Sequence, residues 1–551
     1  MDALTLPQPP IEESLAARPT LDFGPVGAIL GTQDTIDLPA GVYYLGDDEF
    51  PIYRNVPTVG GQTINGAGTD ATILVFGNGR TPSSPQNGDS GLKIDANCTV
   101  RNLTIVNLSE SYTKNNLLRI GVGNSLRDVT LENVRIVDRG RVQSPRTGNL
   151  VHSLTLLNCD FETEEAPTFE NVRNLRVLGG SYRWNGQRFR MINCPGFVVR
   201  GASFRWDTTR WKHLVDNQGL PEPDRESGCF ETTFSHGGVI EASRIVTAGP
   251  YETVRSAEGP ATQIAGIAAY NAVFRVAEVH GRSIKVKAYE GGPSQDTQPA
   301  NWGGDDWCNV FVHEGKTHML SVLTGYARGQ SRWAAKQGTD TIGILDDAPS
   351  WAGTGLQEDD LVSLSVATSV DQAVQDCFIE GYNTAASLYD GAFRFRFRRN
   401  HCLNTGALLM RSATIVEGRT PNSGVSHLPV WDCEILDNVF VGDNGRRLTG
   451  ISAYSPSQAY YDVPRNFSGN RVWRNVIHGQ DMANGVEAPS HDGIDLFVHS
   501  YNNGTVGTER IGGIDLGSGA NANVVDGNVI GGRPYNGWRT GYPGPTVTPT
   551  F

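Results

Sequence analysis

The chain has 551 residues, with 46 Lys and Arg against 59 Asp and Glu, so its formal net charge is −13. An acidic chain is a poor partner for nucleic acid or an anionic membrane, although a local arginine cluster can reverse the sign of the charge. There is no apolar run of about 18 residues, so the sequence predicts no membrane span. The start lacks a basic end followed by an apolar core, so we expect a secretory signal to be absent or already removed.

Cysteine usage predicts neither a metal site nor a redox motif. The cysteines are scattered singly and no CxxC pair occurs. We therefore expect buried free thiols, no bound metal and no cofactor. The cysteines are Cys98, Cys159, Cys194, Cys229, Cys308, Cys377, Cys402 and Cys433.

Residues 1–20 are rich in Pro and acidic residues, which predicts an extended arm or an attachment segment. From Leu21 to Trp206 the text becomes repetitive. Apolar residues stand four before, two before and three after each of a series of anchors, in the alternating pattern of a strand. The anchors are Asn102, Asn133, Asn158, Gly179 and Gly201. A period near 22 residues with a bend in each coil predicts a solenoid whose strands stack on one another.

The columns of this solenoid can be read from the same register. Glu162, Arg183 and Arg205 occupy one position on successive coils, and Trp184 and Trp206 occupy the next. Stacked coils lie about 4.8 Å apart, so these side chains are expected to touch. Asn and Gly suit the bends because both tolerate unusual backbone angles.

The segments that carry a family resemblance come early in the chain. They are Leu21-Asp22-Phe23-Gly24, LPAGVYYL from Leu38, INGAGTDATIL from Ile64 and CTVRNLTIVN from Cys98. These segments resemble those of the pectate-lyase-like right-handed parallel β-helix proteins, which include bacteriophage tailspikes and many polysaccharide hydrolases and lyases. The resemblance covers roughly 21–205 and implies the fold, but the fold carries many activities. Only Pro25 to Ile36 separate the first two segments, so we expect a shortened cap.

The expected architecture is all-β, a right-handed parallel β-helix with an inserted small β domain. Composition and rhythm place the parts as follows: an arm over 1–20, a first part of the β-helix over 21–247 with a long loop at 207–238, an inserted β domain or barrel over 248–367, a second part of the β-helix over 368–532, and an extended tail over 533–551. Late in the second part, Gly493-Ile494-Asp495-Leu496 and Gly513-Ile514-Asp515-Leu516 repeat at a spacing of 20, which predicts adjacent coils.

The outward side chains of such a sheet form flat ladders on which a polysaccharide can lie. Hydrolysis needs two carboxyl groups about 5 to 9.5 Å apart, one protonated and one ionised. Elimination from an acidic sugar needs a base and a cation that neutralises the uronate. Carboxylates on neighbouring coils are close enough to push their pKa values apart.

The first candidate site is the loop 207–238 with the coils beneath it. Its catalytic candidates are Glu162, Asp207, Asp216 and Glu226, with Asp224, Glu231, His213 and His236 in the same loop. Its substrate-binding candidates are Arg183, Arg205, Trp184, Trp206 and Trp211. Alternatively, the Glu–Arg–Arg column stabilises the stack and the loop acids are solvated.

The second candidate is Asp495 with Asp515, stacked on adjacent coils, and Asp492 beside them. Asp492-Gly493-Ile494-Asp495 is similar to the NTDGID stretch of polygalacturonase-type β-helix glycosidases, which implies a catalytic Asp492. Ser490-His491 stand where that motif has Asn-Thr. Alternatively, these aspartates bond to backbone at a bend or bind a structural cation.

The third candidate is a basic stripe. Arg394, Arg396 and Arg398 alternate along a predicted strand and would point the same way, either toward an anionic sugar or toward Glu380 and Asp390. Trp302, Trp307, Trp431 and Trp473 serve either packing or ring stacking.

The resemblance implies a homotrimeric phage tailspike on the virion tail, attached through its N-terminus. We expect it to bind and depolymerise a host surface polysaccharide, capsule or lipopolysaccharide, as a glycosidase rather than a lyase. Two alternatives stay open. One is a secreted microbial β-helix hydrolase or lyase, and the other is a non-catalytic carbohydrate-binding adhesin.

Overall fold

The structure is a computed structural model of the 551-residue chain. It divides into two compact units, which we call unit 1 (residues 1–230 and 239–251) and unit 2 (231–238 and 252–551). No helix among the described residues is long and apolar enough to cross a membrane. The residues that the structure describes are 10–22, 24–30, 32–46, 50–52, 61–76, 90–107, 116–121, 125–139, 145–186, 188–207, 228–248, 252–255, 272–288, 316–338, 340–345, 348–381, 384–389, 391–411, 413–416, 425–441, 449–458, 467–478, 492–502, 505–506, 524–530, 533–535 and 539–540.

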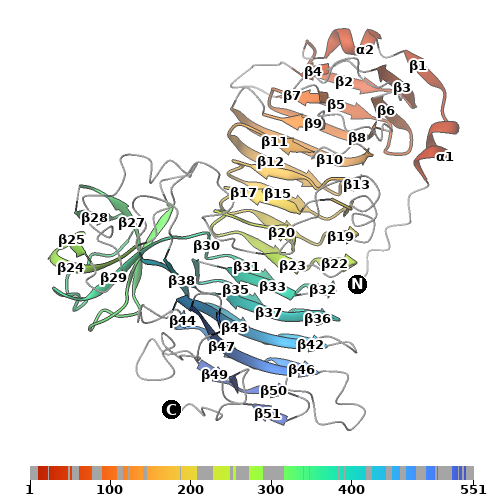
Figure 1. Ribbon diagram of the computed structural model, residues 1–551. Coiled ribbons are helices and arrows are strands. Elements are labelled where there is room, and N and C mark those ends of the chain that lie inside the picture. Colours follow the sequence, from red (N-terminus) through yellow and green to blue (C-terminus); the bar gives the residue numbers. More distant parts are fainter. Residues whose placement is uncertain are drawn as a thin grey trace. The chain divides into compact units, whose positions relative to one another are not determined.

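Unit 1 is built from two long parallel sheets whose strands stack coil on coil (Figure 1). The first sheet consists of β1 (Thr20–Asp22), β2 (Thr35–Leu38), β3 (Gly41–Gly46), β5 (Gln62–Gly66), β6 (Thr72–Phe76), β8 (Cys98–Asn107), β10 (Leu126–Asp138), β12 (Val151–Leu157), β13 (Asp160–Thr163), β15 (Leu175–Leu178), β16 (Ser181–Trp184), β18 (Val198–Arg200), β19 (Ser203–Asp207), β21 (Val239–Glu241) and β22 (Arg244–Ala248). The second consists of β4 (Phe50–Ile52), β7 (Ser90–Ile94), β9 (Asn116–Ile120), β11 (Arg146–Thr147), β14 (Thr168–Glu170) and β17 (Phe189–Ile192). This arrangement is consistent with a parallel β-helix.

The predicted register of unit 1 is confirmed. Glu162 pairs with Arg183 and Arg183 pairs with Arg205, while Trp184 pairs with Trp206 on the same strands. Residues about 22 positions apart in sequence therefore lie side by side, as the repeat predicted.

The five predicted anchors all adopt the left-handed backbone conformation. Asn102, Asn133 and Asn158 have φ of 57°, 51° and 50°, and Gly179 and Gly201 have 68° and 66°. Asn tolerates this region better than other residues with a side chain. The Asn133 amide nitrogen also donates to Asn102 Oδ1 at 3.1 Å, so neighbouring bends bond to each other.

The N-terminal segment differs from the predicted extended arm. Residues Ile11–Ala16 form a helix, α1, and Ile11 and Leu15 pack on Val42, Ile73, Val75, Val106 and Val137. Residues 1–9 lie outside the described part of the chain. The second short helix, α2 (Gly24–Ile29), falls in the expected shortened cap.

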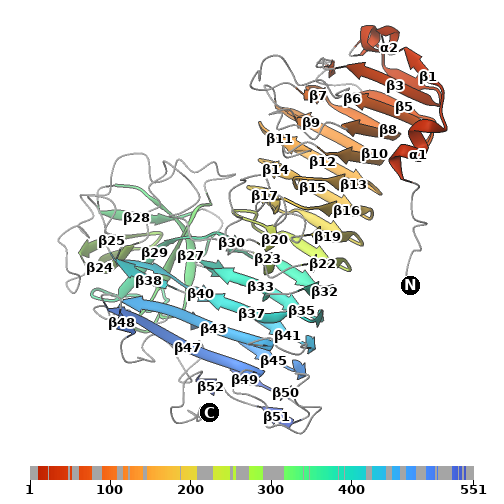
Figure 2. The same ribbon diagram turned by 45° about the vertical axis from the view of Figure 1, so that its right-hand side comes forward.

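Unit 2 repeats the stacked-coil arrangement (Figure 2). One sheet holds β31 (Ala373–Gln375), β32 (Phe378–Gly381), β35 (Arg396–Arg398), β36 (His401–Leu403), β41 (Glu434–Leu436), β42 (Val439–Val441), β45 (Arg471–Trp473), β46 (Val476–His478), β49 (Val524–Asp526), β50 (Asn528–Ile530) and β51 (Arg533–Tyr535). A second holds β23 (Glu252–Arg255), β33 (Thr384–Tyr389), β37 (Gly406–Arg411), β38 (Ala413–Val416), β39 (Val425–Leu428), β43 (Thr449–Gln458), β47 (Asp492–Asn502), β48 (Thr505–Val506) and β52 (Arg539–Thr540). A third, narrow sheet holds β30 (Ser369–Val370), β34 (Ala392–Phe393), β40 (Val430–Trp431) and β44 (Phe467–Ser468).

Buried asparagines join the coils of unit 2. Asn400, Asn438 and Asn475 are at most 1% exposed. Asn438 Oδ1 accepts from the Asn400 backbone N–H and amide, and the Asn438 amide donates to Asn475 Oδ1 and to the Phe397 carbonyl. The ladder satisfies backbone groups where the coil turns away from regular pairing.

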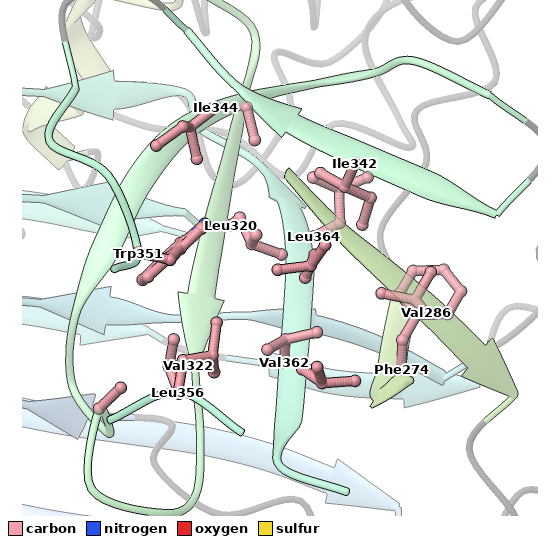
Figure 3. Close-up of a cluster of buried hydrophobic side chains, with 14 residues drawn as sticks. Phe274, Val286, Leu320, Val322, Ile342, Ile344, Trp351, Leu356, Val362 and Leu364 are labelled. Atoms are coloured by element: carbon pink, nitrogen blue, oxygen red, sulfur yellow. The ribbon is translucent and has the colours of Figure 1, made fainter. Parts of the chain in front are cut away.

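A closed six-stranded antiparallel barrel lies inside the segment 248–367 that was predicted as an inserted β domain. Its strands are β24 (Ala272–His280), β25 (Ser283–Ala288), β28 (Thr341–Ile344), β27 (Ser331–Lys336), β26 (His318–Val322) and β29 (Leu361–Val366), in that order around the barrel. Figure 3 shows its core, where Phe274, Leu320, Ile342, Trp351 and Leu364 meet. The residues on either side of His280-Gly281 alternate between apolar and polar, which predicts two strands, and they form the hairpin of β24 and β25.

The predicted long loop 207–238 is wrong at both ends. Asp207 is the last residue of β19. Gly228–Glu231 form a strand, β20, in which Cys229 and Phe230 are fully buried. Two tight turns follow, with Phe234 and Gly237 at positive φ. Residues 208–227 lie outside the described part of the chain.

Candidate functional site

Some residues of the first predicted site are exposed and others are buried. Glu162, Arg183 and Arg205 are exposed on one column of unit 1. Trp184 and Trp206 are 1% and 0% exposed, so the prediction that their rings offer a stacking surface is wrong. Trp184 packs on Phe189 and Phe230, and the Trp206 indole N–H donates to the Gly186 carbonyl at 2.8 Å.

The loop acids of that site are only partly described. Asp207 is half-buried in β19, and Glu231 is 3% exposed with its Oε1 accepting from the Thr233 hydroxyl. His236 Nε2 bonds to the Lys316 carbonyl at 3.1 Å, and burial lowers the pKa of its ring to about 4. The other loop candidates, His213, Asp216, Asp224, Glu226 and Trp211, lie outside the described residues.

The second predicted site is not assembled as expected. Asp492 and Asp495 lie on β47, where the register neighbours of Asp495 are Ser452 and Arg539. Ser452 and Arg539, rather than Asp515, therefore flank Asp495 in the sheet, and the predicted stacking of Asp495 on Asp515 is wrong. Asp515 lies outside the described residues. The 20-residue repeat failed here because the connection after Asn502 continues into β48 rather than into the next coil.

The structure confirms the predicted alternation for two of the three arginines of the third predicted site and places the other one differently. Arg396 and Arg398 do alternate outward on β35, with Phe397 buried between them. Arg394 instead lies at a bend with φ 54° and forks onto Asp371, with its Nε and Nη2 at 2.7 and 2.8 Å from the two carboxylate oxygens. Asp390 lies outside the described residues, and the acid that Arg396 and Arg398 meet is Glu434 rather than Glu380.

Glu434 is the centre of the site that the structure assembles. On neighbouring strands, Arg396 pairs in register with Glu434, and Glu434 pairs with Arg471. Arg396 Nε lies 3.8 Å and Arg471 Nη1 3.7 Å from the carboxylate, and Arg398 Nη2 contacts it directly. Three guanidinium groups thus surround one carboxylate, a local positive excess in a chain of net charge −13.

The other arginines of this face have acids of their own. Arg399 forks onto Asp376 and Arg474 forks onto Asp437, with all four nitrogen–oxygen distances between 2.6 and 2.8 Å. Each of these pairs joins bends on neighbouring coils. The positive excess is therefore concentrated on β35, β41 and β45, around Glu434.

A second carboxyl group stands two residues before Glu434. Asp432 lies at the bend that precedes β41, with φ 55°. Burial raises the pKa of Asp432 to about 6, and Arg394 and Arg471 oppose that rise. Gly469 on the next coil leaves room for it, because a side chain there would meet Asp432 Oδ1 at 2.1 Å. Asp432 and Glu434 thus differ in environment although they are close in sequence.

An exposed indole completes the face. Trp473 follows Arg471 by two positions on β45 and keeps 38% of its surface exposed, whereas Trp431 is fully buried. The Arg474 guanidinium lies 4.5 Å from the centre of the Trp473 ring. Gly527 lies beneath it, since a side chain there would approach the indole nitrogen to 2.9 Å. Arg474 thus covers one face of the ring, and the part of the indole that stays exposed is an aromatic surface of the kind that packs on sugar rings.

Among the described residues, no group of three or more His, Cys, Asp or Glu side chains is placed to hold a metal ion. The groups that the structure brings together at Glu434 are carboxyl and guanidinium groups. Sequence reasoning named Arg396 and Arg398 as part of a basic stripe and, without assigning it, Trp473. It missed Asp432, Glu434 and Arg471, because the coils that align them are 38 and 37 residues apart rather than 22.

No protein-family model matches the chain, and no curated protein sequence matches it. Among solved structures, the chain is similar to the mannuronan C-5 epimerase AlgE6 A-module of Azotobacter vinelandii at 10% identity and a TM-score of 0.30, over 89% of this chain and 90% of that one. It is also similar to the catalytic domain of a GH87 α-1,3-glucanase in complex with nigerose at 10% identity and a TM-score of 0.26, over 80% of this chain and 65% of that one. Likeness at these TM-scores is too weak to assign an activity.

Proposed function

We propose that the outer face of β35, β41 and β45 binds an acidic polysaccharide and that the protein hydrolyses it there. The observation that carries the proposal is the set of three arginines around Glu434 beside the exposed Trp473. Guanidinium groups pair well with carboxylates of an acidic sugar, and an indole stacks on the apolar face of a sugar ring.

The two carboxyl groups take different roles in this proposal. Asp432, whose pKa is raised to about 6 by burial, holds its proton in weakly acidic solution and serves as the general acid that protonates the leaving oxygen. Glu434, among its arginines, serves as the ionised partner that attacks the sugar or activates a water. The bond that breaks is the glycosidic C–O bond, and water supplies the new hydroxyl group and the proton that restores Asp432.

Asp432→Asn and Glu434→Gln test these roles on a panel of acidic and neutral bacterial capsular polysaccharides. Each change should lower the rate of reducing-end formation by roughly 100- to 10,000-fold, the usual contribution of a general acid or base. Activity of the unchanged protein should fall as pH rises through about 6, because the proton on Asp432 is then lost. Asp376→Asn is the matched control, since the Asp376 carboxylate forks with Arg399 rather than with the arginines around Glu434.

Three results would decide against hydrolysis at this site. Full activity in both variants would remove Asp432 and Glu434 from the reaction. An unsaturated product, seen by its ultraviolet absorbance, would indicate elimination. Retained binding without any product would leave the non-catalytic adhesin, which the close contact of Arg398 with Glu434 also suits.

The biological setting that we propose is a homotrimeric tailspike on a virion tail, acting on a host capsule or lipopolysaccharide. Its support is the sequence resemblance over roughly 21–205, and a secreted β-helix hydrolase or lyase is the alternative. The oligomeric state separates these settings.

A further inference from the structure

A basic column runs along the second sheet of unit 1 and shares no residue with the site at Glu434. Lys93, Arg119 and Arg146 pair in register on β7, β9 and β11. Thr168 on β14 pairs with Arg146, and Arg190 on β17 pairs with Thr168. With Pro51 at its start, the column holds four basic residues in six positions and no acid. Lys and Arg are only 46 of the 551 residues of the chain, so the enrichment is pronounced.

These side chains face outward because their strand neighbours face the core. Leu92, Ile94, Leu118, Ile120 and Thr147 are all 1% exposed or less, and strand residues alternate between faces. Arg146 is exposed, and Lys93, Arg119 and Arg190 are half-buried. Thr168 is fully buried and so is Arg190 Nε, so the accessible part of the column consists mainly of Lys93, Arg119 and Arg146.

The acids near the column do not interrupt it. Asp95 lies 3.0 Å from Lys93 and is itself 4% exposed. Glu170 is the next outward residue on β14, while Gly121 and Gly148 occupy the corresponding positions beside Arg119 and Arg146. The middle of the column therefore presents two arginines beside glycine backbone.

We propose that this column is a second binding surface for a linear acidic polysaccharide, distinct from the site at Glu434. Stacked coils space its charges about 4.8 Å apart, which suits a polymer that carries one anionic group on each sugar. Double-stranded DNA carries a charge every ~1.7 Å and meets a strongly acidic chain, so nucleic acid is the poorer match. The surface would hold the polymer without contributing to its cleavage.

The test is retardation of the native protein in gels that contain sodium polygalacturonate, with dextran as the neutral polymer. The starting protein is R396Q/R471Q, which weakens the Glu434 site, so that the remaining retardation reports the column. Adding R119Q/R146Q should weaken binding roughly tenfold, as expected of two exposed ion pairs, and should reduce its dependence on salt. Adding R127Q/R176Q, two exposed arginines on the other sheet of unit 1, should leave retardation unchanged and is the charge-matched control.

The outcomes separate this proposal from the proposed function. No retardation of R396Q/R471Q, or equal losses in the two added pairs, would overturn the column while leaving the Glu434 site intact. Unchanged retardation of R396Q/R471Q together with a loss in R119Q/R146Q would support the column and count against the Glu434 site. Tighter binding of a single-stranded DNA oligomer through the same arginines would overturn the choice of a polysaccharide. Thermal melting of each variant checks that a loss of binding is not a loss of fold.

Discussion

At the scale of single residues, the bends decide how the coils stack. Unit 1 fills most of them with Asn and Gly, which accept positive φ readily, although Ala242 occupies the last one with φ 47°. Unit 2 uses Asp376, Arg399, Asp437 and Arg474, all with φ between 51° and 58°. Arg is unusual there, and its forked ion pair to the acid of the preceding coil offsets the backbone cost. A bend that is stabilised by its neighbour rather than by its own preference is hard to find in one sequence.

The buried asparagine ladder of unit 2 gives a prediction at this scale. Asn438→Ala removes the partners of the Asn400 N–H and the Phe397 carbonyl, both buried. Unsatisfied buried groups cost about 1–3 kcal/mol each, so we expect the free energy of unfolding of unit 2 to fall by about 2–4 kcal/mol. The measurement is urea denaturation followed by circular dichroism.

Asn174→Ala is the comparison, because Asn174 is exposed and its amide donates to the His152 carbonyl at 3.2 Å. It should cost less than ~1 kcal/mol. Equal losses in the two variants would mean that the ladder adds nothing beyond an ordinary surface asparagine.

At the scale of elements, helix α1 explains why one outward column of unit 1 is apolar in its first coils and charged in the later ones. Val75, Val106 and Val137 stand in register with Glu162, which continues into the Arg183 column. The valines are buried because α1 covers them, and the charged members begin beyond it. An ion pair of 2.6 Å between Glu12 and Arg139 fixes the helix at that border.

The helix gives a prediction at this scale. Ile11→Asp places a charge in the apolar contact with Val42 and Val106, which should release α1 and lower the stability of the first coils by about 3 kcal/mol. Hydrogen exchange should then quicken in β3, β6 and β8. Ala16→Asp adds the same charge at an exposed position of the same helix and should leave exchange in these strands unchanged.

The sequence predicted the coils of unit 1 well, and the prediction of strand register became less accurate as the coils became longer. Where coils are near 22 residues, apolar alternation and the bend residues fix the register, and Arg183 and Arg205 were placed correctly. Alternation also located the hairpin around Gly281, although closure of the barrel needs pairings that no local pattern encodes. Glu434 was missed because its column partners follow long connections. Trp184 and Trp206 were misjudged because residues of one strand alternate between core and solvent, and the repeat does not say which face is which.

At the scale of the whole molecule, the proposed tailspike setting rests on assembly. A C3 homotrimer of a 59.6 kDa chain should show about three times that mass by light scattering, at any concentration that permits measurement. The mass should persist in high salt, because an obligate interface depends chiefly on apolar burial. A monomer at all concentrations would contradict the tailspike and favour a secreted enzyme.

Seven cysteines are buried in the described residues: Cys98, Cys159, Cys194, Cys229, Cys377, Cys402 and Cys433. Burial raises the pKa of Cys98, Cys159, Cys194, Cys229, Cys402 and Cys433, and a thiol kept protonated inside a core is a poor nucleophile. With Cys308 replaced by Ser, the folded chain should therefore react only slowly with maleimide dyes. A single fluorophore could then be attached through Tyr44→Cys in unit 1 or Tyr326→Cys on the barrel, where the native side chains are 49% and 84% exposed. The inert interior makes this chain well suited to site-selective optical reporting on each unit while polymer is bound.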